Sequence, residues 1–195
     1  MPALATPAPE AASPTPPAGS EPGSYPGELV ADVATDVGAV RVRPIRREDA
    51  HGLVAFHADL SHDSQYQRFF NAHPDLLPAE VQRFTWVDYR NRLALVAEVD
   101  GRLIAVARYD RIDETTEAEV AFVVADAYQC RGLGTMLLHR LAEAAAERGI
   151  TCFAAETLPD NHRMQAVFRE SGFEAHARFK DGVVKFALSI TAGGA

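Results

Sequence analysis

Cysteine is scarce in this chain, which has only Cys130 and Cys152 among its 195 residues. Two cysteines do not make a disulfide framework or a zinc site. The seven histidines are scattered along the sequence, without the spacing of metal ligands. We therefore expect no metal cofactor, and we expect the protein to work in a reducing compartment, the cytoplasm.

Long apolar runs are also missing. No stretch approaches the roughly 20 residues that a membrane helix needs, and the N-terminus lacks the basic start and apolar block of a secretory signal. Positive charge is in the minority, since 19 Lys and Arg stand against 27 Asp and Glu and the formal net charge is −8. This acidic balance argues against nucleic acid or an anionic membrane as the main partner.

Proline is concentrated near the N-terminus, where eight of the twelve prolines fall within residues 1–30. A stretch this rich in Pro, Ala, Ser and Gly has too little apolar surface to offset the entropy of ordering it. We therefore predict a disordered Pro/Ala-rich tail over residues 1–36 and one folded domain over residues 37–195.

Hydrophobic periodicity predicts that this domain is of the α/β class, with one mixed sheet. Alternating or continuous apolar runs bounded by turn residues predict strands over 39–45, 92–99, 103–112, 117–125, 151–157, 173–179 and 183–190. Apolar residues at helical spacing predict helices over 48–60, 63–70, 78–86, 132–148 and 161–171.

The strand predicted over 117–125 contains the run Val120–Val124, which has no polar face. Such a strand is typically central and covered on both sides. Glu119 is a carboxylate beside this run, and burial among apolar groups is one way in which proteins prepare a carboxylate for work as a general base. The alternative is a strand-end carboxylate in water, or one paired with Arg108 across the predicted hairpin.

A glycine-rich loop, Gln129–Gly134, joins that strand to the helix predicted over 132–148. A turn of this kind offers free backbone N–H groups and the positive end of a helix dipole, and both suit a pyrophosphate. Gly132 and Gly134 allow close approach to the backbone, and Arg131 adds a charge that pairs with phosphate. The alternative is a tight turn without a ligand. A Rossmann site is disfavoured because its third glycine is absent, and a Walker A loop is excluded because no Gly-Lys-Ser/Thr follows.

Over about residues 39–190 the chain resembles the GNAT superfamily of acetyltransferases. Gln129–Gly134 matches the superfamily's Q/R-x-x-G-x-G/A loop, Val42–Asp49 resembles its first strand and helix start, and Asn161–Met164 resembles its second cofactor motif. The resemblance implies the GNAT fold, with a mixed, largely antiparallel sheet of about six to seven strands flanked by helices. It also implies an N-acetyltransferase with acetyl-CoA as co-substrate.

Two segments, Glu119–Gln129 and Ser61–Phe70, further resemble the bacterial protein lysine acetyltransferases of the Pat type. This resemblance implies lysine side chains of metabolic proteins as substrates, acyl-CoA synthetases among them, and it assigns the catalytic glutamate to Glu119. Four acidic residues are candidates for a rim that attracts a lysine substrate: Asp59, Asp63, Glu117 and Asp126. The alternative is that each is a solvated surface charge. The fold alone leaves open a small-molecule amine acetyltransferase or a non-catalytic acyl-CoA-binding module.

The superfamily pattern also implies which residues bind the co-substrate. The backbone at Phe122, Val123 and Val124 would hold the pantetheine arm, and Asn161 would contact the cofactor from a later loop. A backbone N–H at Val124 or a neighbour would polarise the thioester carbonyl. Many relatives carry a tyrosine as general acid where this chain has Phe168. The pyrophosphate would lie on the main-chain N–H groups of Gln129, Cys130, Arg131, Gly132, Leu133, Gly134 and Thr135.

Overall fold

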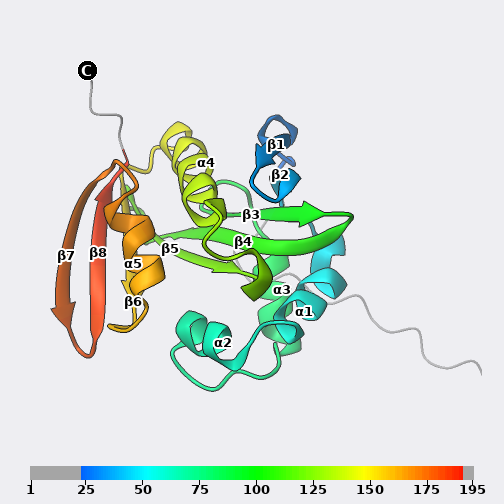
Figure 1. Cartoon of the computed structure of the whole chain (residues 1–195). Coiled ribbons are helices and arrows are strands. Elements are labelled where there is room, and N and C mark those ends of the chain that lie inside the picture. Colours follow the sequence, from blue (N-terminus) through cyan, green and yellow to red (C-terminus); the bar gives the residue numbers. More distant parts are fainter. Residues whose placement is uncertain (1–22, 191–195) are drawn as a thin grey trace, which may run out of the picture.

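One eight-stranded sheet runs through the computed structural model of the chain, which describes residues 23–190 (Figure 1). The strand order is β1-β2-β3-β4-β5-β6-β8-β7, and every neighbouring pair is antiparallel except β5 and β6. The mixed, largely antiparallel sheet expected from the sequence is therefore confirmed, but it has eight strands rather than six to seven, because β1 was not predicted. Its strands are β1 Ala31–Thr35, β2 Gly38–Pro44, β3 Arg92–Val99, β4 Arg102–Arg111, β5 Glu117–Val124, β6 Cys152–Thr157, β7 Glu174–Lys180 and β8 Val183–Ser189.

Asp-Gly pairs make two of the tight hairpins of this sheet, while Asp36 and Val37 make the two-residue turn between β1 and β2. Asp100 and Gly101 join β3 to β4 with φ of 50° and 74°, and Asp181 and Gly182 join β7 to β8 with φ of 54° and 81°. Two successive residues with positive φ suit the right-handed twist of the flanking strands, and Asp-Gly is among the sequences that adopt this turn most easily. The turn residues therefore fix both hairpins locally.

Helices cover both faces of the sheet (Figure 1). On one face lie α4 (Leu133–Glu147) and α5 (His162–Arg169), and the other face carries α1 (Ala50–Ala58), α2 (His62–Phe69) and α3 (Pro78–Thr85). Each layer has its own apolar cluster, the larger one under α4. Within the described residues no helix is long and apolar enough to cross a membrane.

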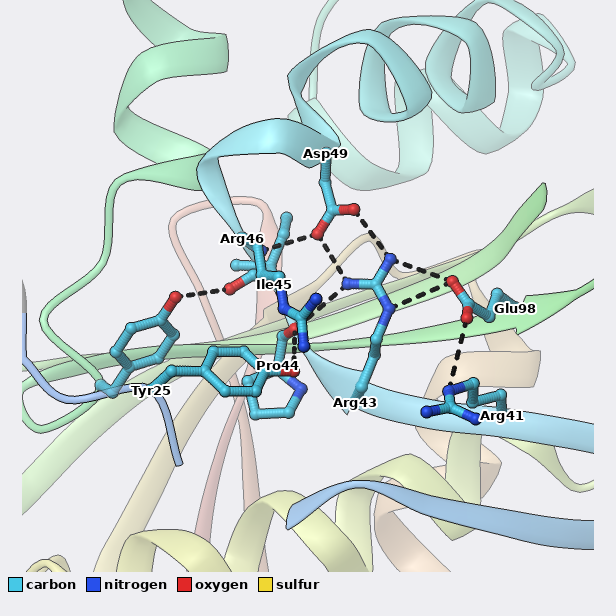
Figure 2. Close-up of polar contacts among 9 residues, drawn as sticks. Tyr25, Arg41, Arg43, Pro44, Ile45, Arg46, Asp49 and Glu98 are labelled. Atoms are coloured by element: carbon cyan, nitrogen blue, oxygen red, sulfur yellow. Dashed lines mark hydrogen bonds and ion pairs between the residues drawn. The ribbon is translucent and has the colours of Figure 1, made fainter. Parts of the chain in front are cut away.

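The link from β2 to the first helical layer is an arginine network (Figure 2). The guanidinium of Arg43 donates to both carboxylate oxygens of Asp49, at 2.7 Å each, and to Glu98 Oε2 at 2.9 and 3.1 Å. Asp49 also accepts the backbone N–H of Arg46 at 2.6 Å. Desolvation opposes ionisation of Asp49, but the hydrogen bond from Arg43 and that from Arg46 outweigh it and hold its pKa below the usual range. The network joins β2, the turn before α1 and β3.

The predicted tail boundary is wrong, because the folded part begins well before Val37. Strand β1, which lies inside the range predicted as disordered, pairs along its whole length with β2. Further upstream, the ring of Tyr25 packs edge-on against Tyr89 at 5.7 Å between centroids, and the guanidinium of Arg46 lies 4.3 Å from the Tyr25 centroid. The rest of the predicted tail, residues 1–22, lies outside the described residues.

Candidate active site

The parallel strands β5 and β6 separate partway along their length. They pair only at Glu117–Cys152, Ala118–Phe153 and Glu119–Ala154. Beyond the third pair a cavity of about 650 Å³ opens, walled by the rest of β5, the end of β6, α2, α5 and the loop before α4. This volume lies within the range of small-molecule and cofactor sites. The separation of two neighbouring strands therefore creates this cavity.

The prediction that β5 is central and covered on both faces is confirmed for its place in the sheet and for the α4 face, but it is only partly met on the α2 face, which opens onto the cavity. Ala118, Val120 and Phe122 are buried beneath the α4 layer, whereas Ala121 and Val123 are half-buried and line the cavity. Cavities that receive ligands are mostly lined by apolar side chains. A strand wall that faces such a cavity therefore has the same apolar sequence pattern as a strand covered on both sides.

Glu119 stands in the cavity wall at the last position where β5 and β6 pair. Its side chain is exposed, so the burial expected for it is wrong, and it has no hydrogen bond or ion pair with any described residue. The alternative pairing with Arg108 is not formed either. The buried guanidinium of Arg108 donates instead to Asp110 Oδ2 at 3.3 Å and lies 4.5 Å from the ring centroid of Phe84. The carboxylate of Glu119 is thus free to accept a proton.

A second charged side chain, Arg68 of α2, lines the same cavity. It is half-buried, and its guanidinium lies 4.9 Å from the ring centroid of Phe69. Burial and then repulsion from Arg108 lower the pKa of Arg68 to about 10, while the negative charge of Glu119 acts in the opposite direction. Arg68 therefore stays cationic at neutral pH and is electrostatically coupled to Glu119.

The loop before α4 presents a row of free backbone donors. Cys130 and Gly132 adopt left-handed conformations, with φ of 58° and 75°, and Gly132 is the N-cap residue of α4. Within the described part of the chain, none of the N–H groups from Cys130 to Thr135 has a hydrogen-bond acceptor. Unsatisfied donors at a helix N-terminus make an anion-binding site.

The loop residues predicted to bind the cofactor differ in where their side chains lie. All of them line the cavity except Arg131, which is exposed and outside its wall. Leu133 is buried in the core, so only its backbone is available. A Cβ atom on Gly134 would lie 3.4 Å from Val167 Cγ2, which is an ordinary van der Waals contact, so the packing of α4 on α5 does not by itself require glycine at this position.

Asp126 belongs to a bracing contact rather than to a free acidic rim. Its Oδ1 accepts hydrogen bonds from Ser61 Oγ at 2.6 Å and Ser64 Oγ at 2.8 Å, and its Oδ2 accepts the N–H of Ser61 at 2.9 Å. Desolvation opposes ionisation, but these hydrogen bonds outweigh it and hold the pKa of Asp126 below its usual range. The contact fastens the start of α2 to the segment that follows β5.

Gln129 extends this brace across the loop. Its Nε2 donates to Ser64 Oγ and to the carbonyl oxygen of Val124, both at 3.0 Å, and its Oε1 accepts from Arg163 at 2.7 Å. The side chain therefore connects α2, the end of β5 and α5. Its hydrogen-bonding groups are engaged within the protein, which leaves the backbone of Gln129 for any cofactor.

Helix α5 forms another wall of the cavity. Asn161 is its N-cap residue and accepts the N–H of Met164 at 3.1 Å. Phe168, the residue at the position of the tyrosine in many relatives, is buried, and its ring centroid lies 6.0 Å from that of Phe122 and 5.2 Å from that of Phe186. Asn161 and Phe168 both line the cavity, and the phenylalanine brings no hydroxyl group there.

Two cavity residues at the end of β6 were not predicted from the sequence. Glu156 is exposed and accepts a hydrogen bond from Lys185 Nζ at 2.6 Å. Thr157 is buried, and both residues line the cavity. In the sequence, Glu156 and Thr157 look like ordinary strand residues. They face a cavity only because β5 and β6 separate, and no sequence pattern predicts that separation. Among the described residues no cluster of three or more His, Cys, Asp or Glu has the geometry to hold a metal ion.

The family model for the acetyltransferase (GNAT) family matches residues 37–173 of the sequence. A sheet split between β5 and β6, with an anion-binding loop at the split, agrees with that match. The chain belongs to the GNAT family of acetyltransferases and is an N-acetyltransferase. The family uses acetyl-CoA as its acyl donor.

Similar proteins include members of the Pat group. The crystal structure of the GNAT domain of S. lividans PAT has a TM-score of 0.81 and 43% identity, and the match covers 85% of this chain and 99% of that domain. The acetyltransferase Pat of Mycolicibacterium smegmatis is 31% identical over 134 residues, which are 67% of this chain but only 40% of Pat. An acetyltransferase of Pseudomonas aeruginosa is 30% identical over 138 residues, covering 69% of this chain and 74% of the relative.

Proposed function

We propose that the protein transfers the acetyl group of acetyl-CoA directly to lysine side chains of metabolic proteins, with acyl-CoA synthetases among its substrates. The observation that carries this proposal is the unpaired carboxylate of Glu119, which stands in the cavity wall where β5 and β6 separate. The likeness to the GNAT domain of S. lividans PAT, at 43% identity, favours protein lysine as the acceptor.

The donor side uses backbone groups. The free N–H groups from Cys130 to Thr135 would hold the pyrophosphate. The N–H of Ala125 bonds back to Ile104, and successive residues of a strand point their N–H groups to opposite edges, so the N–H groups of Phe122 and Val124 point to the edge that faces the cavity. The pantetheine arm can pair with this edge as an added strand would. One of these N–H groups would polarise the thioester carbonyl.

The acceptor side uses Glu119 as general base. A lysine ammonium has a pKa of about 10.4 and must lose a proton before its nitrogen can attack a thioester. The ammonium would give that proton to solvent on the way into the site. As the neutral nitrogen then forms its bond to the carbonyl carbon, Glu119 would take a proton from it, and the carbon–sulfur bond would break with its electron pair on sulfur. The charge of Arg68 beside the site opposes entry of the ammonium form and favours the neutral amine.

The base assignment is tested with Glu119→Gln, which keeps the shape of the side chain. Loss of a general base lowers kcat by about 10²- to 10⁴-fold, and we expect the KM for acetyl-CoA to stay the same because the donor contacts are elsewhere. Glu117→Gln is the matched control, since Glu117 is exposed on the same strand and outside the cavity wall. Unchanged kcat in Glu119→Gln at saturating acetyl-CoA would show that the base is wrongly assigned.

Glu156 is a second carboxylate in the cavity wall, and its substitution makes the test sharper. Lys185 holds Glu156 in an ion pair, whereas Glu119 has no ion-pair partner among the described residues. We expect Glu156→Gln to lower kcat by no more than about fivefold, the equivalent of one exposed ion pair. The reverse pattern, with Glu156→Gln inactive and Glu119→Gln active, would transfer the role to Glu156.

The acceptor class is tested separately. The purified protein is incubated with acetyl-CoA and an acyl-CoA synthetase, and acetylated lysines are mapped by mass spectrometry. A parallel incubation uses small polyamines and aminoglycosides. Acetylated lysine in the synthetase supports the proposal, and transfer to small amines alone contradicts it. Binding of acetyl-CoA without transfer to any amine would indicate a binding module.

A further inference from the structure

Thr157, the last residue of β6, has a buried hydroxyl group without a partner. Only 2% of the residue is exposed, and its Oγ1 forms no hydrogen bond with any described residue. Thr157 also lines the cavity between β5 and β6. Buried polar groups in folded proteins are nearly always hydrogen-bonded. An unpaired hydroxyl on a residue that lines a ligand cavity therefore points to a partner on the ligand.

The position of Thr157 limits which part of the ligand it can reach. It lies three residues beyond Ala154, while Phe122 lies three residues beyond Glu119, and Ala154 and Glu119 form the last pair of the two strands. Thr157 and Phe122 therefore stand at corresponding levels on the two sides of the opening. Phe122 is one of the two residues whose N–H faces the cavity and can polarise the thioester carbonyl. The thioester sulfur, one bond from that carbonyl carbon, belongs at the same level.

Two other polar side chains of the cavity wall already have partners. Glu156 is paired with Lys185, and Arg163 is held by Gln129. Phe168 contributes only a ring. The pantetheine amides have the backbone edge of β5 to pair with, so they do not need the hydroxyl of Thr157.

We infer that the hydroxyl of Thr157 donates a hydrogen bond to the sulfur of CoA as the thiolate leaves. The inference rests on the proposed acetyl transfer. As the amine nitrogen forms its bond to the carbonyl carbon, the carbon–sulfur bond breaks and its electron pair stays on sulfur. The proton from the amine goes to Glu119, and the hydroxyl keeps its own proton and shares it with the thiolate. The thiolate is protonated by water after release.

A hydroxyl at this place favours the transition state over the bound substrate. A thioester sulfur is a weak hydrogen-bond acceptor, whereas a thiolate carries a full charge and accepts strongly. A hydroxyl hydrogen also rotates freely toward its acceptor. The interaction therefore strengthens as the carbon–sulfur bond breaks, and only interactions of this kind accelerate the chemical step.

The first experiment is kinetic and uses Thr157→Val, which replaces the hydroxyl by a methyl group of similar size. We expect kcat to fall about ten- to a hundredfold, the effect of losing a hydrogen bond to a charged group. The KM for acetyl-CoA should change little, because the thioester sulfur of the bound substrate accepts only weakly. Thr157→Ser keeps the hydroxyl and should restore most of kcat. A serine variant as slow as the valine variant, or a valine variant with normal kcat, would overturn the inference.

The second experiment measures binding rather than activity. Isothermal titration calorimetry compares CoA with desulfo-CoA between pH 7 and pH 9.5, a range that spans ionisation of a thiol with a pKa of about 8.5. The wild-type protein should prefer CoA increasingly as the pH rises, and Thr157→Val should lose that preference. An equal loss of affinity for both ligands would show that the hydroxyl contacts the pantetheine arm instead, which contradicts the inference.

Thermal unfolding of the ligand-free protein completes the test. Replacing an unsatisfied buried hydroxyl by a methyl group removes a desolvation penalty, so the Tm of Thr157→Val should equal or exceed that of the wild type. A lower Tm would show that the hydroxyl has a stabilising partner within the protein. If the wild type neither binds CoA nor transfers acetyl groups, the proposed function fails. If it does both and Thr157→Val behaves identically, only the role of Thr157 fails.

Discussion

Cys130 has a backbone conformation that disfavours its side chain. Its φ is 58°, in the left-handed region, and its side chain is exposed at the cavity rim. Residues with a Cβ atom lose roughly 1–2 kcal/mol in this region, whereas glycine does not. The chain therefore keeps some strain in the loop whose backbone N–H groups are free, a common property of ligand-binding segments.

This strain leads to a prediction for Cys130→Gly. We expect a small rise in Tm, up to the equivalent of about 1 kcal/mol, because relief of the left-handed strain exceeds the added flexibility of the unfolded chain. The KM for acetyl-CoA should not change, since the proposed contacts use the backbone. Cys130→Val is the control that should lower Tm, because a β-branched side chain is poorly tolerated at positive φ. Differential scanning calorimetry and steady-state kinetics measure both effects.

At the scale of elements, α2 and the loop before α4 are fastened together by Ser64. Its hydroxyl donates to Asp126 and accepts from Gln129, and the residue is buried. The helix that carries Arg68 and the loop that offers the free N–H groups therefore have one shared brace. Binding of acetyl-CoA at the loop and the position of Arg68 on α2 should therefore depend on each other through Ser64.

We predict that Ser64→Ala weakens this brace. The variant should lose about 1–2 kcal/mol in free energy of unfolding, because Asp126 and Gln129 each lose a partner. Its KM for acetyl-CoA should rise, since the loop is less well held. Tyr66→Ala is the control on the same helix, because Tyr66 is 50% exposed and should leave the KM for acetyl-CoA unchanged. Urea unfolding measures the stability and initial-rate kinetics measure the KM. A Ser64→Ala variant with the stability and the KM of the wild type would contradict the role of Ser64.

Strand β1 is an element whose contribution can be measured by truncation. Leu29, Val33 and Val37 are partly buried against the main core, and β1 covers the edge of β2. A protein that begins at Val37 should be about 2 kcal/mol less stable than one that begins at Gly23, at about 1 kcal/mol for each of the two half-buried aliphatic side chains that are removed, Leu29 and Val33. Equal urea midpoints for the two proteins would show that β1 contributes nothing.

At the scale of the whole molecule, the network around Arg43 connects the sheet with the layer of α1, α2 and α3. Because the pKa of Asp49 is lower in the folded protein than in the unfolded chain, its ionised form stabilises the fold. That stability is fully present above the unfolded pKa of about 3.9 and is lost as the pH falls below it.

We predict that Asp49→Asn lowers the free energy of unfolding by about 2–3 kcal/mol at pH 7, since it leaves Arg43 with one carboxylate partner fewer in a mostly buried site. The difference from the wild type should shrink as the pH is lowered from 5 to 3. Asp75→Asn, at an exposed position, is the control and should show no such dependence. Urea unfolding at several pH values makes the measurement, and a constant difference would contradict the assignment.

The local elements of this fold follow from short stretches of sequence. The Asp-Gly turns, the helical spacing of leucines in α4 and the loop before it depend on neighbouring residues, and the seven strands and five helices expected from them are present with bounds shifted by a few residues. The glycine loop was also recognisable, because the donors it leaves free are backbone groups at the start of a helix. Of the residues predicted to hold the cofactor, only Arg131 stands outside the cavity wall.

Tertiary structure decided the rest. Whether β1 is ordered depends on its partner β2, a contact that no local pattern contains. The apolar second face of β5 and the exposure of Glu119 depend on where β5 and β6 separate, and the unpaired hydroxyl of Thr157 depends on the same separation. The sequence by itself determined the elements and the anion-binding loop, because hydrogen bonds between near neighbours define them. The distance between two strands is set by everything packed around them, so only the folded chain decided the cavity and the side chains that face it.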